Sequence, residues 1–197
     1  MKELPSYEEK KIKILVEARA LFARYGFHKC TLQDIASACG LTKPALYYYF
    51  SSKDDLFTAV VRQESLLFLN LLKETIQPDE SPLLHLRAFF VVRFERFKEL
   101  LVLYDLTQQV GRELLPLAEQ ARQDFFIQEM SILMEILDKG VEDGIFKPLS
   151  SKLIGHSLIA VFKGLESNFF TADQSPEEAI QSIHELLKLF FYGIVKE

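Results

Sequence analysis

The spacing of apolar side chains is the feature that most constrains the fold of this chain. Steps of three and four residues separate the members of its longest apolar stripe, and these steps match the period of an α-helix. The stripe consists of Leu83, Leu86, Phe90, Phe94, Phe97, Leu101 and Tyr104. Sustained strand alternation and Asn-Gly hairpin turns are absent from the sequence. The sequence therefore predicts an all-α fold of about nine helices.

Glycines and helix-capping residues divide the N-terminal segment into short helices. The first helix is expected to end at Gly26, where glycine tolerates a left-handed backbone. Thr31 offers a hydroxyl cap to a short second helix, which is expected to stop at Gly40. Thr42 can cap a third helix over residues 43–49, and the proline in its first turn needs no N–H there. Two short helices joined by a glycine turn indicate a helix-turn-helix, whose second helix enters the DNA major groove.

Three adjacent tyrosines lie in the third of these helices. Leu46 and Phe50 are four residues apart, so they share one face and point inward. Tyr47 and Tyr48 are then expected to point outward, and Tyr49 to lie at the edge. A tyrosine combines a rigid ring with a terminal hydroxyl, which suits a contact along a phosphodiester backbone. The tyrosines therefore predict contacts to DNA phosphates.

The start of the third helix is predicted to reach base edges. Its exposed residues are expected to be Thr42, Lys43, Pro44 and Ala45. A lysine can donate to guanine O6 or N7, and an alanine methyl can contact a thymine methyl. Lys53, the Thr31 hydroxyl and the free N–H groups of both helix starts are predicted to bind phosphates. The alternative is a three-helix corner packed on a larger helical protein, with the tyrosines at an internal seam.

Charge is distributed unevenly along the chain. Residues 1–53 carry 9 lysines and arginines against 5 acids, a net of +4, whereas the remainder carries 14 against 23, a net of −9. A basic head on an acidic body predicts that the head meets an anionic partner. A chance imbalance would give the same counts.

The stretch TLQDIASACGLTKPALYYYFSSKDDLF, Thr31 to Phe57, resembles the N-terminal signature of TetR-family transcriptional regulators. The resemblance implies a homodimer whose two heads dock in successive major grooves of a palindromic operator, and a variable helical body that binds a small inducer. It assigns Thr31, Tyr47, Tyr49 and Lys53 to phosphates, and Gln33, Thr42, Lys43, Pro44 and Ala45 to base edges or their surroundings. Many relatives carry histidine where this chain has Tyr49, so that contact departs from the family pattern.

The last two helices are predicted to form the dimer interface. Their apolar faces are wider than one packing surface needs, and two such helices paired across a two-fold axis would form a four-helix bundle. The predicted interface consists of Leu158, Phe162, Leu165, Phe169, Ile183, Leu187, Phe190 and Ile194. The alternative is that both helices are simply buried within the monomer.

A ligand pocket is predicted among the middle helices, because aromatic and methionine side chains suit a hydrophobic or aromatic small molecule. The predicted lining residues are Phe90, Arg93, Phe94, Phe97, Tyr104, Phe126 and Met130. The alternative is that this aromatic stripe is ordinary core.

Other classes of protein find little support in the sequence. It lacks a glycine-rich phosphate loop, a nucleophile elbow and a metal-binding spacing, so we expect neither an enzyme nor a cofactor or metal. No apolar stretch reaches the ~18 residues of a membrane span, which predicts a cytoplasmic protein without a membrane partner. Cys30 and Cys39 are expected to be reduced and buried.

The resulting hypothesis is a ligand-responsive regulator, most simply a repressor. Residues 1–52 would bind the operator DNA, and residues 53–197 would bind the effector and form the homodimer. Ligand binding would shift the fourth helix, over residues 53–75, and change the separation of the two heads. A helical carrier of lipophilic molecules and a cryptic helical enzyme are the alternatives.

Overall fold

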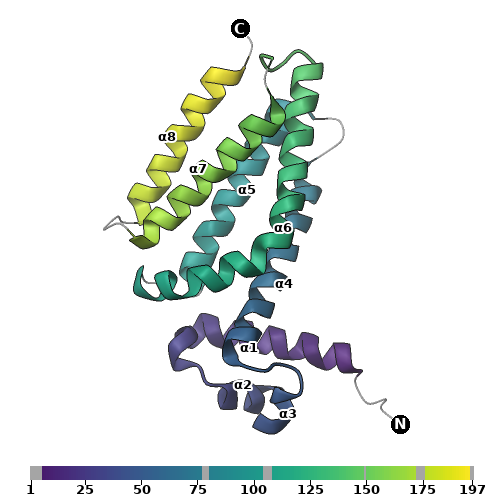
Figure 1. The fold of residues 1–197 in the computed structure, drawn as a ribbon, viewed down its shortest axis with the longest axis vertical. Coiled ribbons are helices and arrows are strands. Elements are labelled where there is room, and N and C mark those ends of the chain that lie inside the picture. Colours follow the sequence, from purple (N-terminus) through teal and green to yellow (C-terminus); the bar gives the residue numbers. More distant parts are fainter. Residues whose placement is uncertain (1–5, 77–79, 104–107, 149, 172–175, 196–197) are drawn as a thin grey trace. The chain divides into compact units, whose positions relative to one another are not determined.

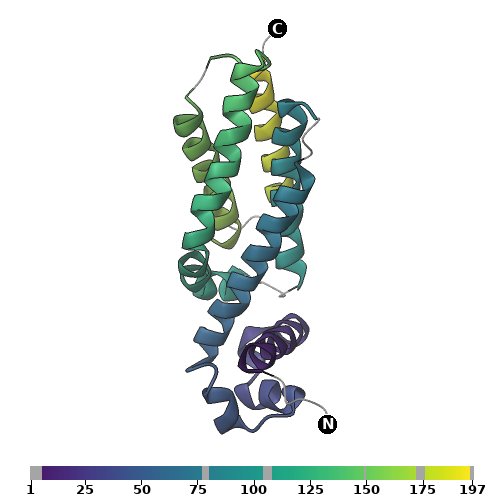
Figure 2. The same cartoon turned by 90° about the vertical axis from the view of Figure 1, so that its right-hand side faces the viewer.

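The structure, a computed structural model, describes residues 6–76, 80–103, 108–148, 150–171 and 176–195; for residues 75, 97–103, 108–112, 166–171, 176–177, 179–180 and 183 it describes only the backbone. These ranges form eight helices (Figures 1 and 2): α1 Tyr7–Lys29, α2 Leu32–Cys39, α3 Lys43–Tyr47, α4 Lys53–Thr75, α5 Pro82–Leu103, α6 Gln108–Glu142, α7 Ser151–Thr171 and α8 Pro176–Ile194. Within them, the β-structure is limited to one isolated bridge between Phe146 and Val195. The predicted all-α fold is confirmed.

The described ranges contain eight helices rather than about nine because α6 is longer than the sequence suggested. Gly111 and Pro116 indicated a break, but both lie within α6, which runs for 35 residues. A proline inside a helix removes one backbone hydrogen bond and bends the helix more readily than it ends it. Residues 108–142 therefore form one helix across both expected breaks.

The chain packs into two compact units. The first comprises Met1–Ser65 and Glu99–Arg122, and the second comprises Leu66–Lys98 and Gln123–Glu197. The first unit extends beyond residue 52 because the beginning of α4 contributes Leu56, Phe57 and Val60 to its core. The two units are defined by packing alone. The division between a DNA-binding part up to residue 52 and an effector-binding part from residue 53 stays a prediction.

The first unit, called the head below, has its own hydrophobic core. Its buried members are Ile14, Ala18, Phe22, Cys30, Ile35, Ala36, Cys39, Leu46, Phe50, Leu56, Phe57, Val60 and Leu114. Both cysteines are free and buried, as expected. Gly40 ends α2 with φ 70°, as predicted. α1 does not end at Gly26 but continues to Lys29 across a kink, where Gly26 has the positive φ of 76° that glycine tolerates.

The second unit, called the body below, is built around an aromatic core. Phe90 stacks on Phe162 with ring centroids 4.8 Å apart and an interplanar angle of 14°, which joins α5 to α7. Phe190 of α8 meets the Phe90 ring edge-on at 6.1 Å. Offset and edge-to-face arrangements are the favourable geometries of aromatic pairs. None of the described helices is long and apolar enough to cross a membrane.

An ion pair is buried inside the body. The Arg93 guanidinium on α5 donates to the Glu129 carboxylate on α6, and the two residues are 2% and 3% exposed. The Arg93 guanidinium also lies 5.8 Å from the centroid of the Phe162 ring. A buried charge is tolerated only when a partner compensates for its lost hydration, so each of these residues depends on the other.

Candidate nucleic-acid interface

Local hydrogen bonds place α2 and α3 as a helix-turn-helix. The Thr31 hydroxyl accepts from the Asp34 N–H at 3.2 Å, and the Asp34 carboxylate accepts from the Thr31 N–H at 2.9 Å, so both orphan donors at the start of α2 are satisfied. At the other end, the Leu41 N–H donates to the Ala36 carbonyl at 2.8 Å. The Thr42 hydroxyl then accepts from the Ala45 N–H at 3.3 Å and starts α3.

The exposed end of α3 has the arrangement that its sequence predicts. Thr42, Lys43 and Pro44 are exposed and Ala45 is half-buried. Leu46 is 1% exposed and anchors the helix in the head core. This anchor leaves the N-terminal end of α3 projecting from the surface with a cation, a hydroxyl and a methyl group.

The tyrosines follow the predicted faces of α3. Tyr47 is 46% exposed and Tyr48 is 74% exposed, whereas Tyr49 is half-buried. The alternative of an internal seam is therefore excluded for Tyr47 and Tyr48 within the chain itself. α3 is shorter than expected, because regular helix ends at Tyr47 and the next two residues form a turn.

Tyr7, which sequence analysis did not single out, completes an aromatic cluster with the tyrosines of α3. Its ring stacks on Tyr49 at 5.0 Å and meets Tyr48 edge-on at 5.8 Å. Ser6 and Glu9 form a capping box that would have revealed the start of α1 in the sequence. The contacts of Tyr7 span about forty residues of chain, so no local signal predicted them.

Thr31 and Gln33 are exposed, but both side chains have partners within α2. The Thr31 hydroxyl donates to the Asp34 carboxylate at 2.6 Å, and the Gln33 amide donates to the Ser37 hydroxyl at 3.3 Å. A phosphate contact from Thr31 requires its hydroxyl hydrogen to turn away from Asp34. The contacts of Thr31 and Gln33 with DNA stay predictions.

The Thr31 hydrogen bonds should be visible in the titration of Asp34. They lower the pKa of Asp34 below its ordinary value of 3.8, the hydroxyl more than the backbone N–H. A lowered carboxyl pKa gives stability that is present above the unfolded value and is lost as the pH falls through the folded value. We expect Thr31→Val to raise the pKa of Asp34 toward 3.8 in an NMR titration. Gln33→Ala is the matched control, and an unchanged Asp34 pKa in Thr31→Val would contradict the assignment.

Lys53 lies at the start of α4 and is only half-exposed. Its ammonium lies 4.3 Å from the centroid of the Phe27 ring and 3.4 Å from the His28 carbonyl, to which it donates. Burial lowers the pKa of the Lys53 ammonium below its ordinary value. Lys53 therefore supports the turn after Gly26, and its predicted phosphate contact would be an additional role.

The head also receives residues from α6, which sequence analysis placed wholly in the body. Leu114 is buried in the head core, and Leu117 packs against it. The Glu113 carboxylate lies 2.7 Å from the His28 imidazole. Residues 28 and 113 are far apart in sequence, so only the tertiary structure reveals this contact.

The predicted ligand-binding residues that the structure describes are packed in the body core. Phe90, Phe94 and Met130 are buried, Arg93 is paired with Glu129, and Phe126 is half-buried. Tyr104 and the side chain of Phe97 lie outside the described residues. The described members are brought together, but as core side chains, which was the alternative. Their contact with an effector stays a prediction.

The predicted dimer residues divide into two groups. Leu158, Phe162 and Ile194 are buried in the chain's own core, and Leu165, Leu187 and Phe190 are half-buried. The side chains of Phe169 and Ile183 lie outside the described ones. The first three serve packing within the monomer: α7 packs against α8, and all three residues belong to the buried cluster of the body. These three are therefore core residues of the single chain, and the contact of the other predicted residues with a second copy stays a prediction.

An exposed helix-turn-helix on an all-α body defines the class of DNA-binding transcriptional regulators. The family model of bacterial regulatory proteins of the tetR family matches residues 14–60. This range covers most of α1, all of α2 and α3, and the beginning of α4. The match supports the resemblance of the head to TetR-family transcriptional regulators.

Curated relatives agree with this assignment. The HTH-type transcriptional repressor KstR2 of Mycobacterium tuberculosis is 27% identical over 147 residues, which cover 68% of this chain and 68% of the relative. The HTH-type transcriptional regulator RutR of Escherichia coli K12 is 37% identical over 86 residues, which cover 44% of this chain and 40% of RutR. The relatives and the fold are those of regulators and not of enzymes.

Solved structures share the fold along nearly the whole chain. A transcriptional regulator from Cytophaga hutchinsonii has a TM-score of 0.79 and 25% identity, with 93% of this chain and 97% of that chain covered. The ketosteroid transcriptional regulator KstR2 of Mycobacterium tuberculosis has a TM-score of 0.57 and 22% identity, with 98% of each chain covered. The similarity to the second structure supports the fold alone.

Proposed function

We propose that this regulator is a cytoplasmic repressor that binds a palindromic operator as a homodimer and is released by a hydrophobic or aromatic small molecule. The observation that carries the DNA-binding part is the exposed N-terminal end of α3, where Lys43 and the tyrosines surround one projecting helix. The repressor role is supported by the name of one relative, the transcriptional repressor KstR2.

Contacts to DNA bases and contacts to DNA phosphates come from different parts of α3. The N-terminal tip of the helix meets the bases, and its flanks meet the phosphates. Lys43 reads a base, with Thr42, Pro44 and Ala45 close to the groove floor. Tyr47 and Tyr48 contact phosphates, and the ring of Tyr7 stacks on that of Tyr49, which restrains the third tyrosine. The two heads of a dimer engage half-sites roughly 34–36 Å apart.

Exposed apolar side chains on α7 and α8 support a revised dimer face. Leu153 and Val161 lie eight residues apart on α7, and Leu189 and Tyr192 lie three apart on α8, so each pair shares a helical face. All four are exposed in the single chain. A second copy that covers these faces would bury them in an isologous four-helix bundle.

Two helices provide a route by which an effector in the body changes the head. α4 belongs to the head up to Ser65 and to the body from Leu66, and α6 changes from head to body after Arg122. A ligand that favours one position of these helices shifts the separation of the two heads. Operator binding is then expected to weaken when the ligand is added.

The division between base and phosphate contacts can be tested with two lysine variants. Lys43→Ala is expected to cost roughly 1–3 kcal/mol of binding free energy on the operator and to relax its sequence preference. Lys53→Gln is expected to weaken binding to all sequences alike and to reduce the salt slope by about one unit. The measurement is fluorescence anisotropy with the upstream region of the chain's own gene and with a scrambled duplex, at several salt concentrations.

Folding of the variants must be compared, because Lys53 also supports Phe27 and His28 within the head. Lys152→Gln, on the exposed surface of α7, is the matched control for a lost charge. Equal effects of Lys43→Ala and Lys53→Gln on both duplexes would contradict the proposal that Lys43 contacts a base and Lys53 a phosphate. Absence of binding to any duplex by the folded wild type would favour a carrier of lipophilic molecules instead.

A further inference from the structure

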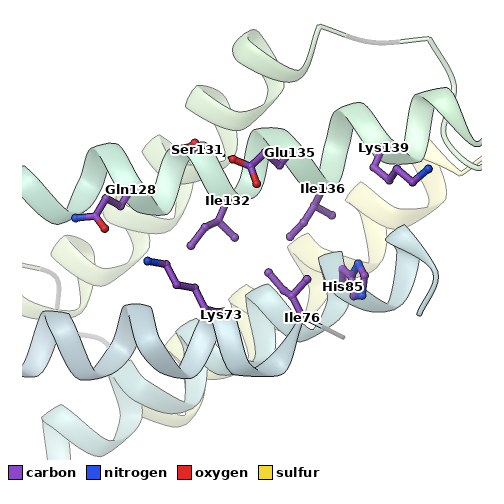
Figure 3. Close-up of a pocket in the computed structure, with 9 residues that line it drawn as sticks. All are labelled: Lys73, Ile76, His85, Gln128, Ser131, Ile132, Glu135, Ile136 and Lys139. Atoms are coloured by element: carbon purple, nitrogen blue, oxygen red, sulfur yellow. Dashed lines mark hydrogen bonds between the residues drawn. The ribbon is translucent and has the colours of Figure 1, made fainter. Parts of the chain in front are cut away.

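A groove opens between α4 and α6, within the body and apart from the predicted aromatic pocket (Figure 3). Its volume is about 520 Å³. Small-molecule sites in proteins occupy about 300–1,000 Å³, so the groove has room for a compact metabolite. The predicted ligand-binding residues that the structure describes do not line it; among them, Phe90, Phe94 and Met130 are buried in the body core.

The middle of the groove is apolar. Ile76, which directly follows α4, lines it together with Ile132 and Ile136 of α6, and Figure 3 shows the three side chains facing the space between the two segments. Ile132 and Ile136 also belong to the body core, so packing holds them in place. Such a floor removes an alkyl chain or ring from water at a gain of roughly 25 cal/mol per Å² of apolar surface.

One end of the groove carries a cation that is available to a ligand. Lys73 extends its ammonium along the groove toward Gln128 (Figure 3). Within the described part of the chain, the ion pairs do not involve Lys73. An ammonium and a side-chain amide together supply several donors and so match a carboxylate, which only accepts.

The other charged groups of the groove already have partners. At the far end, the Lys139 ammonium lies 2.7 Å from the Asp143 carboxylate. The Glu135 carboxylate accepts from the Ser131 hydroxyl at 3.1 Å. His85 also lines the groove and is buried (Figure 3). The end with Lys73 therefore attracts an anion most strongly, because Asp143 compensates the Lys139 ammonium and the Glu135 carboxylate adds a negative charge to the rest of the lining.

We propose that this groove binds an amphipathic monocarboxylate, whose apolar chain or ring lies on the isoleucines and whose carboxylate meets Lys73 and Gln128. This inference deepens the proposed function by giving the effector a chemical class and a place, and its regulatory meaning rests on that function. The binding itself is a property of the body and can be measured without DNA.

The test compares three probes with the same eight-carbon chain: octanoate, octanol and octyltrimethylammonium. Isothermal titration calorimetry of the full chain is expected to show that octanoate binds at least about tenfold more tightly than octanol, because a hydrogen bond to a charged group adds to the apolar contact. Lys73→Gln is expected to abolish this preference by weakening octanoate about tenfold while leaving octanol unchanged. Lys152→Gln is the matched control and should bind octanoate as the wild type does.

The position of the probe is checked by NMR of the isoleucine methyl groups. Octanoate should shift the signals of Ile76, Ile132 and Ile136 first, and Ile76→Asn should weaken octanoate and octanol alike. Failure of octanoate to bind, an unchanged affinity in Lys73→Gln, tighter binding of the cationic probe or shifts confined to other isoleucines would each overturn the proposal. Such a result would leave the operator measurements with Lys43→Ala untouched, so the two proposals fail separately.

Discussion

Replacing Glu129 with alanine is expected to lower the free energy of unfolding by about 3–5 kcal/mol. The variant leaves the Arg93 guanidinium in the core at 2% exposure without the carboxylate to which it donates. Removing one member of a buried pair costs far more than the pair itself contributes, because the remaining charge has lost its hydration. Urea denaturation followed by circular dichroism, at one fixed protein concentration, measures the change.

Two further variants show whether the loss comes from breaking the buried pair of Arg93 and Glu129. Asp143→Ala removes the partner of Lys139 on the exposed surface of α6 and should change the free energy of unfolding by less than about 1 kcal/mol. Arg93→Met combined with Glu129→Leu replaces the buried pair by apolar side chains and should recover most of the loss. A Glu129→Ala variant that is as stable as Asp143→Ala would show that the Arg93 charge does not depend on Glu129.

Phe162→Ala is expected to cost about 3–5 kcal/mol of the free energy of unfolding. Its side chain is 1% exposed and stacks on Phe90, so its removal leaves a cavity at the junction of α5 and α7. The sequence had placed Phe162 in the dimer interface, where its loss would instead weaken self-association. Urea denaturation and sedimentation velocity on the same samples separate the two effects.

Leu189→Ala is the matched variant on the surface. Leu189 is 72% exposed on α8, so its truncation should change the free energy of unfolding by less than about 0.5 kcal/mol while it weakens the dimer. Phe162→Ala could instead weaken dimerisation and leave the free energy of unfolding unchanged. Such a result would support a place for Phe162 in the interface and contradict its assignment to the core.

The helix-turn-helix could be predicted from the sequence because every signal that defines it is local. Thr31 and Thr42 cap helices through donors three residues away, and Gly40 supplies the left-handed residue between them. The four-residue spacing of Leu46 and Phe50 fixes which tyrosines face outward. Such signals act within one or two helical turns, so a linear reading recovers them.

The wide apolar faces of α7 and α8 left two interpretations open for a physical reason. Periodicity tells which side of a helix is apolar, but it does not tell whether that side meets its own chain or a second copy. Phe162 and Val161 are adjacent in sequence, yet one stacks on Phe90 and the other is exposed. The same ambiguity turned the predicted pocket residues Phe90 and Phe94 into core.

The sequence by itself determined the helical class, the caps and turns of α2 and α3, and the outward face of the tyrosines, because backbone propensity and capping are decided by near neighbours. Only the tertiary structure decided that Glu129 neutralises Arg93, that Leu114 completes the head core, that Tyr7 joins the tyrosines and that a groove lies beside Lys73. These features join residues from different helices, and their partners depend on how packing distributes buried apolar surface and charge across the whole chain.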